Sequence, residues 1–452
     1  MFTVKEILDA TKGKLLSGDS SAVVKGISID SRTFQKGEGY IAIKGKRLDG
    51  HRFIKAVAAK GANLFVVSKK IRIPSNLPII LVKDTTVALG HIARLHRRKF
   101  SIPVIAVTGS AGKTTTKELI AQVLSAKYSV LKNHKTENNQ YGVSLTLLRM
   151  HATHQVAVLE LGTNQKGEIR QLSQIVEPTI CVYTNVGASH LEGLKSVAGV
   201  FQEKLQMTRY LRGKGPVIYN GDDPHLQLIP KRVKSKRLKS FSIVNRSSFQ
   251  AQDIKRRENA QITFRVGKTS YTLNTMSVHN VYNALAAIIC GDVLRISPSL
   301  MKIQLQQFSF SNSRAQLKRN NGYMCIDDTY NANPVSFRSA IETLTATPVK
   351  GKRLLICADM LELGNQAEYY HRWLGELISH SNIDVCLTYG RYARTVHETI
   401  RKLNKNLVAV HCRSTRDVNT RLSQYLQPGD CLLVKGSRGM KMEDVVANLA
   451  KE

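Results

Sequence analysis

Short apolar runs of strand length alternate with amphipathic stretches of helix length along most of the chain. In its middle, the apolar runs at 104–108, 156–161, 180–185 and 217–220 have the composition of buried strands, and helical patterns separate them. Strands that are joined by helices form parallel sheets that are covered on both faces. The pattern therefore predicts a mostly parallel, doubly wound α/β sheet.

The two ends of the chain repeat this alternation on a smaller scale. We expect three α/β domains, at 1–83, 84–310 and 311–452, of which the last is a smaller Rossmann-like unit. The elements expected in the first domain are a helix at 4–10, a strand at 39–43, a helix at 52–60 and strands at 63–67 and 79–82. Those expected in the last domain are strands at 323–327, 353–358, 385–389 and 430–435, and helices after Pro334, at 367–379 and at the end of the chain.

The composition is that of an ordinary globular protein, with 42% hydrophobic and 22% charged residues. No apolar run approaches the roughly 18 residues that span a bilayer, and the amino terminus is an amphipathic segment, not a secretory signal. The seven cysteines are odd in number and mostly lie in apolar runs, so we expect reduced thiols in the core. We therefore expect a cytoplasmic protein without a membrane span.

A glycine-rich turn lies between a predicted strand and a predicted helix in the sequence VIAVTGSAGKTTTKE. This layout is typical of a phosphate-binding loop, because glycines let backbone N–H groups approach phosphate oxygens and the helix adds the positive end of its dipole. Val107 occupies the position of the first Gly of the longer Walker motif, so the turn has the short T-G-x-x-G-K-T form. We expect a nucleoside triphosphate to bind through Thr108, Gly109, Ser110, Ala111, Gly112, Lys113, Thr114 and Thr115.

Three more side chains with catalytic chemistry follow later strands. Glu160 ends the run VAVLE, His190 follows the strand at 180–185, and Lys204 lies on the next predicted helix. The carboxyl ends of parallel strands meet at one edge of a sheet, where ligands bind. Each residue alone has an ordinary interpretation as a solvated loop or surface side chain, but their order after a phosphate-binding loop favours a shared site.

The chain is unusually basic, since 67 Lys and Arg residues against 33 Asp and Glu residues give a formal charge of +34. Such a surface attracts polyanions in a salt-dependent way, so a basic ATPase that binds nucleic acid is one interpretation. The basic residues are scattered over the chain, however, and only 6% of the residues are aromatic. Because the sequence contains no stacking platform or recognition motif, we expect no dedicated nucleic-acid site.

Motifs that span most of the chain occur in the order typical of Mur ligases, and the sequence resembles that family. They are SIDSRTFQKGEGYIAIKGKRLDGHRF, VTGSAGKTTTKE, TENNQYGVSLTLL, LELGTNQKGEI, TNVGASHLEG with GVFQEK, HNVYNALAA, the Ser313-Arg314 pair, IDDTYNANPVSF, ADMLELG and KGSRGMKME. DDTYNANP and LELGTNQKGEI favour the branch of the family that adds D-alanyl-D-alanine. The diamino-acid-adding Mur ligase and folylpolyglutamate synthetase, which share the phosphate loop and the Glu, His and Lys residues, are the alternatives.

The resemblance implies an ATP-dependent ligase that joins D-Ala-D-Ala to UDP-N-acetylmuramoyl-tripeptide, in the last cytoplasmic step towards the peptidoglycan pentapeptide precursor. The terminal carboxylate of the tripeptide would take the γ-phosphoryl group of ATP, and the amine of the dipeptide would then displace phosphate from the acyl phosphate. The sequence does not tell whether the third residue of the tripeptide is diaminopimelate or lysine. We expect a monomer.

The resemblance also implies roles for the catalytic side chains. Lys113 would contact the outer phosphates, Thr114 and Glu160 would hold a first Mg²⁺, and His190 would help to hold a second Mg²⁺. Lys204 would be carbamoylated, because a carbamate is an anionic metal ligand whereas an ammonium is repelled by Mg²⁺.

The chain departs from the family after Lys204, where Leu205-Gln206 replace the usual Gly-Glu. This change removes a nearby carboxylate and puts any role of that acid in doubt.

The remaining candidate residues are assigned by resemblance to substrates. Asn283, Arg314, Asp328, Asn331 and Asn333 would face the base, ribose and phosphates of the nucleotide, although a solvated turn is the alternative for Asp327-Asp328. Lys435 and Arg438, predicted in a loop before the last helix, would meet a carboxylate of the dipeptide or the phosphates. Further substrate contacts would come from Asn138 and Asn139. The first domain would bind the UDP-sugar through Asp30, Ser31, Arg32, Lys44, Gly45, Asp49 and His51, which also suit an ordinary turn.

Overall fold

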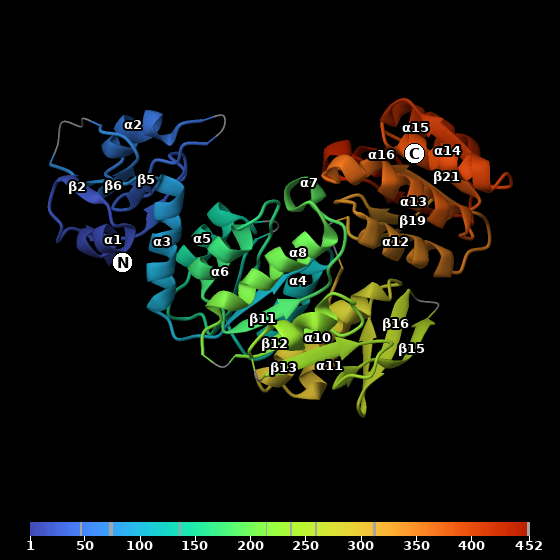
Figure 1. Cartoon of the computed structure of the whole chain (residues 1–452), viewed down its shortest axis with the longest axis horizontal. Helices are drawn as coiled ribbons and strands as arrows, with labels where there is room; N and C mark the ends of the chain where they lie inside the picture. Colours follow the sequence, from blue (N-terminus) through green and yellow to red (C-terminus); the bar gives the residue numbers. More distant parts are fainter. Residues whose placement is uncertain are drawn as a thin grey trace.

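The computed structural model describes residues 1–45, 48–71, 76–134, 137–213, 215–235, 237–257, 260–310 and 313–449. Figure 1 shows three α/β bodies, with the first at the left, the last at the right and the central one between them. Each of the three predicted ranges contains its own sheet with parallel strands, so the predicted fold class is confirmed. The domain boundaries stay predictions, and Ser311, the predicted start of the last domain, lies outside the described residues.

The first body is a small α/β unit with a five-stranded sheet. Its elements are β1 (Phe2–Thr3), α1 (Val4–Thr11), β2 (Lys14–Ser17), β3 (Val23–Val24), β4 (Ile27–Ser28), β5 (Gly39–Ile41), η1 (Gly50–Phe53), α2 (Ile54–Ala59), β6 (Leu64–Val67) and β7 (Ile79–Leu81). The sheet has the order β2-β7-β6-β5-β4, in which only β2 pairs antiparallel. Helix α1 begins at a capping box, in which Thr3 and Glu6 each accept a hydrogen bond from the other's backbone N–H.

The central body contains a seven-stranded parallel sheet in the order β14-β13-β12-β11-β8-β10-β9. Its strands are β8 (Val104–Thr108), β9 (Val130–Lys132), β10 (Val156–Glu160), β11 (Ile180–Tyr183), β12 (Val217–Asn220), β13 (Leu238–Ser242) and β14 (Phe249–Gln250). Its helices are α3 (Thr85–Arg98), α4 (Lys113–Ser125), α5 (Gln140–Leu148), α6 (Glu168–Val176), α7 (Leu191–Leu194), α8 (Val197–Leu205), η2 (Gln206–Tyr210), η3 (Leu226–Leu228), α9 (Ile229–Arg232), α10 (His279–Val293) and α11 (Pro298–Gln307).

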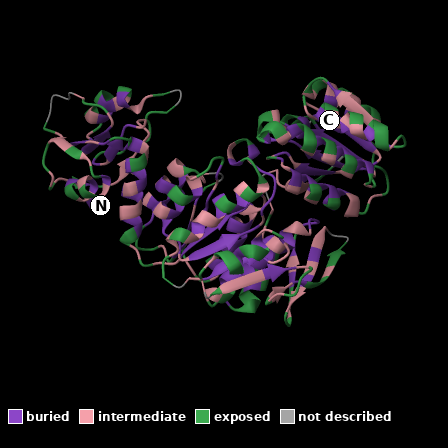
Figure 2. Cartoon of the chain, in the orientation of Figure 1, coloured by how far each residue is buried: buried purple, intermediate pink, exposed green. Residues whose placement is uncertain are grey.

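Alternation along β8 divides the central core into two layers. Val104 and Ala106 pack with the apolar faces of α5, α6 and α8, whereas Ile105 and Val107 pack with α4 and α10. The central strands β8, β10, β11 and β12 are buried on both faces, as the continuous apolar runs predict, and Figure 2 shows buried strands in the middle of this body. This two-sided cover leaves the carboxyl ends of the strands as the accessible edge, and the phosphate loop leaves β8 at that edge.

A small antiparallel sheet was not predicted from the sequence. It consists of β15 (Gln252–Arg257), β16 (Gln261–Val266) and β17 (Thr269–Leu273), and it packs Ile262 and Phe264 onto the α10 side of the central core. Strand β17 likewise buries Tyr271 and Leu273 at alternate positions, whereas β15 carries mostly charged and polar residues.

The last body is the predicted Rossmann-like unit. Its sheet has the order β18-β19-β23-β20-β21-β22, and only β18 pairs antiparallel. The elements are β18 (Gln316–Asn320), β19 (Tyr323–Asp328), α12 (Pro334–Ala346), β20 (Arg353–Ala358), η4 (Gly364–Gln366), α13 (Ala367–Ser379), β21 (Val385–Tyr389), α14 (Ala393–Leu403), β22 (Val408–Cys412), α15 (Thr415–Tyr425), β23 (Cys431–Lys435), η5 (Arg438–Met440) and α16 (Glu443–Leu449). The sequence analysis missed β22 although its first three residues are apolar; this strand lies at the edge of the sheet and buries only its last residue.

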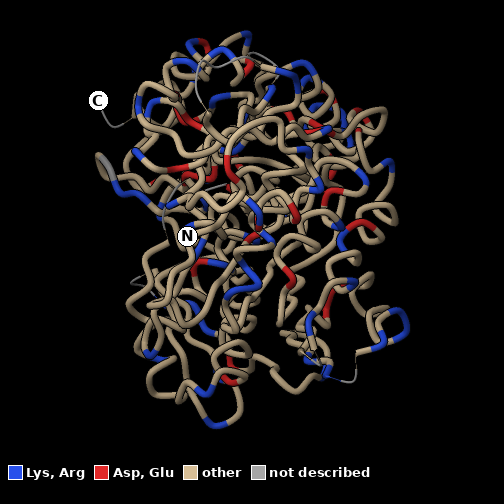
Figure 3. Tube along the Cα trace, turned by 90° about the vertical axis from the view of Figure 1, so that its left-hand side faces the viewer, with Lys and Arg blue, Asp and Glu red and all other residues tan. Residues whose placement is uncertain are grey.

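Two global expectations can be compared with the fold. All seven cysteines are buried and unbridged. In the part of the chain that the structure describes, no helix is both long and apolar enough to cross a bilayer. Lys and Arg occur along the whole trace in Figure 3, so the positive charge is spread over all parts of the molecule.

Helix α6 begins against a buried carboxylate of α8, which generates a stability prediction. Glu203 is 3% exposed and accepts hydrogen bonds of 2.8 Å from the N–H groups of Gly167 and Ile169. Replacing Glu203 by Ala leaves both donors without their acceptor, so the free energy of unfolding of the central body should fall by about 2–4 kcal/mol. Urea denaturation, with hydrogen exchange across α6 as a local probe, measures the effect.

The control for this substitution is Gln202→Ala, at the exposed neighbouring position on α8. The control should leave the urea midpoint and the exchange of α6 unchanged. Equal midpoints for Glu203→Ala and the wild type would contradict the assigned capping role.

Candidate active site

The phosphate loop is held in place by neighbouring strands and helices. Gly112 has φ 76° at the start of α4, and a Cβ at this position would lie 2.6 Å from Oδ1 of Asn283. The Asn185 side chain accepts a hydrogen bond of 2.8 Å from the Ala111 N–H, and its backbone carbonyl accepts one of 3.0 Å from Ser110. These contacts leave the first-turn N–H groups of α4 as the anion-binding donors of the loop.

Two lysine side chains converge on one backbone carbonyl of this loop. Nζ of Lys113 and Nζ of Lys204 each lie 2.9 Å from the Gly109 oxygen. Lys204 is 1% exposed, and burial followed by repulsion from Lys113 lowers its pKa well below the usual value. Burial also lowers the pKa of Lys113. The surface-lysine interpretation of Lys204 is therefore wrong, and a positive charge on both amines at once is unfavourable at this place.

The buried carboxylate of Glu160 lies beside Thr114, the second residue of α4. Oε2 of Glu160 accepts a hydrogen bond of 2.5 Å from Thr114 Oγ1, and Oε1 accepts one of 2.8 Å from Asn138 Nδ2. Glu160 is 2% exposed, and both of these donors are neutral. A buried anion with neutral donors is a suitable ligand for a cation.

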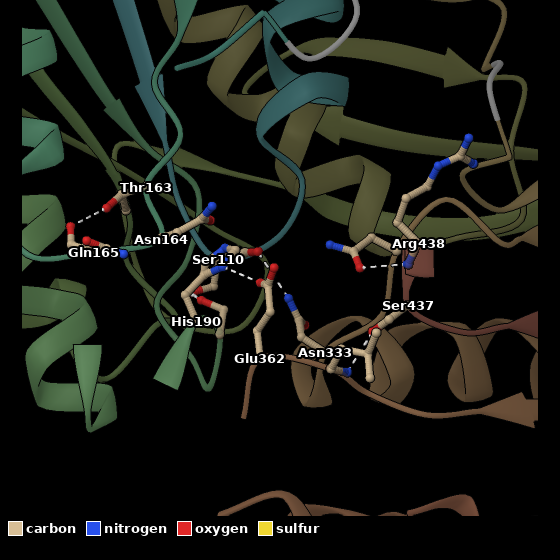
Figure 4. Close-up of polar contacts among 12 residues, drawn as sticks. Ser110, Thr163, Asn164, Gln165, His190, Asn333, Glu362, Ser437 and Arg438 are labelled. Carbon is tan, nitrogen blue, oxygen red and sulfur yellow. Dashed lines mark hydrogen bonds and ion pairs between the residues drawn. The ribbon is translucent and has the colours of Figure 1, made fainter. Parts of the chain in front are cut away.

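His190 lies at the border between the central and last bodies. Its backbone has φ 52° where α7 begins, and its Nδ1 lies 2.6 Å from Oε2 of Glu362. The nearby His190 ring is the main cause of the lowered pKa of Glu362. Figure 4 shows Glu362 reaching from the last body towards His190.

The last body supplies a second group of polar side chains. Asp328 ends β19 and accepts a hydrogen bond of 2.5 Å from Lys435, the last residue of β23, and one of 3.1 Å from the Ala315 N–H. Burial raises the pKa of Asp328, and Lys435 opposes this effect. The guanidinium of Arg314 stacks over the Tyr330 ring at 3.9 Å from its centroid.

These groups surround one cavity of about 730 Å³ between the central and last bodies. The phosphate loop from Ser110 to Thr115 lines one wall, and Arg314, Asp328 and Lys435 line the other. Asn333 connects the walls directly, because its Nδ2 donates a hydrogen bond of 3.1 Å to the carbonyl of Ser110 (Figure 4). The cavity is large enough for a nucleotide together with the reacting end of a second substrate.

Comparison with known proteins identifies the family. The domain described as "Mur ligase family, catalytic domain" matches residues 23–122, the Mur ligase middle domain matches 107–291, and "Mur ligase, glutamate ligase domain" matches 313–438. The UDP-N-acetylmuramoyl-tripeptide–D-alanyl-D-alanine ligase of Bacillus subtilis is 34% identical, over 99% of this chain and 98% of its own. The chain belongs to the Mur ligase family.

Further relatives of this Mur ligase agree with the assignment. The enzyme of the same name from Escherichia coli is 32% identical over 99% of this chain and 98% of its own. Among solved structures, MurF from Acinetobacter baumannii has a TM-score of 0.91 and 28% identity, covering 100% of this chain and 99% of that one. The MurF ligase of Thermotoga maritima in complex with ADP has a TM-score of 0.84 and 25% identity, covering 95% and 98%. The predicted family and its three-part α/β fold are confirmed.

The structure of this Mur ligase corrects one detail of the sequence interpretation and rules out one alternative. Lys435 ends the strand predicted at 430–435 and was also assigned to the loop that follows, but it is the last residue of β23 and its side chain is 1% exposed. The alternative of a solvated turn at Asp327 and Asp328 is wrong, because both end β19 and Asp327 is 2% exposed. A charged residue at the end of an apolar run is typical of a loop unless its partner lies in a neighbouring strand, as it does for Lys435.

Some predicted residues of this Mur ligase lie near the cavity but bind other parts of the chain. Asn139 caps α5 by accepting hydrogen bonds from the Tyr141 and Gly142 N–H groups. Asn283 accepts a hydrogen bond of 3.0 Å from Thr116 and supports α4. The side-chain oxygen of Asn331 accepts one of 2.9 Å from its neighbour Ala332. These residues shape the walls of the site in addition to any ligand contact.

The predicted UDP-sugar residues lie in the first body and do not line the cavity. Arg32 forms an ion pair of 2.6 Å with Asp30, and Asp49 forms pairs with His51 at 2.6 Å and Lys69 at 2.8 Å. Lys44, next to Gly45, also forms an isolated antiparallel backbone bridge with Asp49. Ser31 contributes its carbonyl to Lys60. At the other end of the chain, Arg438 is largely exposed and pairs with Glu443.

The sequence interpretation missed several residues that line the cavity. They are Tyr330, Arg338, Glu362, His279 and Tyr282. Glu362 lies within the quoted motif ADMLELG, but only the contact with His190 distinguishes it from the other acidic residues there. Hydrophobic patterns carry no information on such contacts between separate sheets.

The buried pair of Asp328 and Lys435 generates a testable prediction. Replacing Lys435 by Ala leaves Asp328 without its cation, so the free energy of unfolding should fall by about 3 kcal/mol. A double variant, Asp328→Asn with Lys435→Ala, should lose less than the sum of the two single variants, because neither charge is then left alone. Urea denaturation of the four proteins measures the coupling, and additive losses would contradict a direct pair.

Proposed function

We propose that this Mur ligase joins D-alanyl-D-alanine to UDP-N-acetylmuramoyl-tripeptide with cleavage of ATP, the step that completes the pentapeptide precursor of peptidoglycan. The observation that carries the proposal is the end-to-end similarity to ligases of that name at 32–34% identity. ATP and UDP-linked precursors are cytoplasmic molecules, so we place the reaction in the cytoplasm. We expect the enzyme to act as a monomer, because one chain contributes both walls of the cavity.

In this proposal the phosphates of ATP lie over the amino end of α4. The N–H groups of Lys113, Thr114 and Thr115 point along the helix axis there, and the helix dipole favours the negative charge. The Lys113 ammonium, which now contacts the Gly109 carbonyl, has the reach to follow the γ-phosphate. Arg314 and Asp328 face the same cavity from the last body and would bind the ribose end of the nucleotide.

The residues fit a requirement for Mg²⁺. Among the described residues, no three His, Cys, Asp or Glu side chains are grouped as a self-sufficient metal site. Magnesium typically uses one or two carboxylates together with substrate phosphates and water, which matches a single buried Glu160 beside Thr114. We propose that Thr114 and Glu160 hold one ion, and that His190 with a carbamate on Lys204 holds a second. The ions would neutralise the phosphate charge.

The environment of Lys204 favours the carbamate. Its buried amine shares the Gly109 carbonyl with the Lys113 ammonium, so a second positive charge is unfavourable at this place. When the neutral amine adds CO₂, an N–C bond forms, one proton leaves, and the side chain becomes an anion. The added carboxylate would stand opposite Lys113 and offer oxygen ligands. Leu205-Gln206 follow Lys204 at the end of α8, and the proposal requires no carboxylate from them.

The chain's own residues then act by positioning and by charge. Lys113 stabilises the negative charge that develops on the γ-phosphoryl group while the tripeptide carboxylate attacks phosphorus. The carboxylate oxygen forms the new P–O bond, and ADP leaves. The amine of D-Ala-D-Ala then attacks the carbonyl carbon of the acyl phosphate, loses a proton and expels phosphate. Contact between the two bodies, through Asn333 and Ser110, excludes water from the acyl phosphate.

The other substrate contacts in the proposal come from all three bodies. Asn138, beside Glu160, would face the end of the tripeptide, and Lys435 at the end of β23 with Arg438 in η5 would meet the dipeptide carboxylate. The first body would bind the UDP group through the Asp30 and Asp49 turns. These turns lie in the first body, which has its own sheet. That position suits a long substrate that reaches from one body to the next.

Release of ADP with defined substrates tests the proposed function. We expect steady release only when ATP, UDP-N-acetylmuramoyl-tripeptide and D-Ala-D-Ala are all present, with one ADP for each pentapeptide formed. Tripeptides ending in diaminopimelate and in lysine are compared, because the structure does not select between them. Equal stimulation by a free diamino acid or by glutamate in place of D-Ala-D-Ala would assign the chain to another branch.

Lys113 should be essential for turnover. Lys113→Ala should reduce kcat by more than about a hundredfold, because the loop backbone still binds phosphate but no mobile cation stabilises the transition state. Thermal unfolding should change little. The matched control is Lys302→Ala, which removes an exposed lysine of α11 and should retain full activity. Near-normal turnover of Lys113→Ala would rule out the proposed role.

Lys204 should be replaceable in part by an added anion. Lys204→Ala should be at least about a hundredfold less active and should recover part of its turnover with formate or acetate, which supply the missing carboxylate oxygens. Lys204→Arg keeps a cation but forms no carbamate, so it should stay inactive with the same anions. Intact-mass measurement of the wild type under CO₂ checks the modification. A fully active enzyme with an unmodified Lys204 would contradict the carbamate.

A further inference from the structure

A contact between the central and last bodies involves one of the proposed metal ligands. Nδ1 of His190 lies 2.6 Å from Oε2 of Glu362. His190 belongs to the segment that follows β11, and Glu362 belongs to the loop between β20 and η4 of the last body. Both side chains line the cavity that contains the phosphate loop. Figure 4 shows the two side chains directed towards each other across the border.

The backbone fixes both partners of this contact. His190 has φ 52° and Glu362 has φ 65°, and non-glycine residues adopt such left-handed values only where the surroundings hold them. The Glu192 N–H donates a hydrogen bond of 3.1 Å to the Glu362 carbonyl, so the two loops also bind through their backbones. Gln366 adds a hydrogen bond of 2.9 Å from its side chain to the Lys195 carbonyl. The approach of Glu362 to His190 is therefore part of a docked surface between the two bodies.

The same loop is attached to the proposed dipeptide end of the site. The Leu361 N–H donates a hydrogen bond of 2.8 Å to Oγ of Ser437, and the Ser437 N–H donates one of 3.0 Å to the Asp359 carbonyl. Ser437 lies between Lys435 and Arg438, the proposed partners of the dipeptide. One short loop thus joins the dipeptide side of the cavity to His190.

We propose that Glu362 is a positioning residue for the metal ion held by His190, and that it reaches this position only when the last body docks on the central one. This inference rests on the proposed function, in which His190 is a ligand. Once it accepts a hydrogen bond from Nδ1–H, the Glu362 carboxylate, which lies 2.6 Å from Nδ1, would fix the imidazole tautomer and leave Nε2 free for the ion. Carboxylates that accept from the second nitrogen of a ligating histidine strengthen metal binding in this way.

The arrangement gives the enzyme an order of events. When the last body is undocked, His190 lacks its carboxylate partner and the second ion is held weakly. Docking brings Glu362 to His190 and brings Asn333 to the phosphate loop in the same movement, because both residues belong to the last body. The metal site is then complete only when the cavity is closed to water, which protects the acyl phosphate.

Binding of Mn²⁺, measured by electron paramagnetic resonance, tests this inference without a turnover assay. The full chain is titrated with Mn²⁺ in the presence of a non-hydrolysable ATP analogue and UDP-N-acetylmuramoyl-tripeptide. The wild type should bind two ions. Glu362→Gln should bind the first ion normally and the second about tenfold more weakly, since loss of such a partner typically costs 10–100-fold in affinity.

The matched control is Glu192→Gln. Glu192 is exposed on the same docked surface, and the substitution keeps its backbone N–H, which donates to the Glu362 carbonyl. Its Mn²⁺ binding should equal that of the wild type. In steady-state kinetics Glu362→Gln should lower kcat about tenfold with an unchanged KM for ATP, whereas a general disturbance of the docked surface would raise KM in both variants.

Two results would overturn the inference, and they are distinguishable. If the wild type binds two ions and Glu362→Gln binds both with the same affinity, Glu362 has no positioning role although the ligase function stands. If the wild type binds one ion while releasing ADP only with all three substrates, the second ion itself is absent, and the role of Glu362 is lost with it. Absence of that ADP release would instead contradict the proposed function.

Discussion

The convergence of two lysine side chains on the Gly109 carbonyl is the constraint from which the chemistry of this site follows. A single carbonyl oxygen does not compensate two ammonium charges in a buried place, so a positive charge on Lys204 is unfavourable beside Lys113. In the proposed function, a phosphate over α4 compensates the charge of Lys113, and the neutral Lys204 amine is available for conversion to a carbamate. The loop also needs Gly109, since a side chain there would collide with Thr184.

The fold provides this constraint by bringing separate strand ends together. Parallel pairing of β10, β8 and β11 places Glu160, the phosphate loop and the segment leading to His190 along one edge of the central sheet. The last body offers its own strand ends, with Asp328 and Lys435, to the same cavity. Each sheet alone holds half of the polar groups, which makes the contact between the bodies part of the catalytic geometry.

The sequence alone predicted much of this site because its signals are local. The phosphate loop, Glu160 at a strand end and the three-part α/β order all follow from short patterns, and the structure places these residues at one sheet edge. The pattern did not reveal the Asp328–Lys435 pair or the Glu362–His190 contact, because each joins segments that are distant in the sequence. The edge strand β22 and the antiparallel sheet were also missed, although β16, β17 and β22 carry apolar residues at strand spacing; these strands lie at or outside the edges of the large parallel sheets, where fewer positions are buried.

The central claim is that the tripeptide carboxylate itself attacks ATP, so that a cavity between two bodies protects an acyl phosphate. Oxygen transfer tests it directly. UDP-N-acetylmuramoyl-tripeptide labelled with ¹⁸O in its terminal carboxylate is converted with ATP and D-Ala-D-Ala in ordinary water, and the released phosphate is analysed by mass spectrometry. The account predicts one ¹⁸O atom in each phosphate released. Phosphate without the label would show that water, and not the carboxylate, attacks ATP, and would contradict the account.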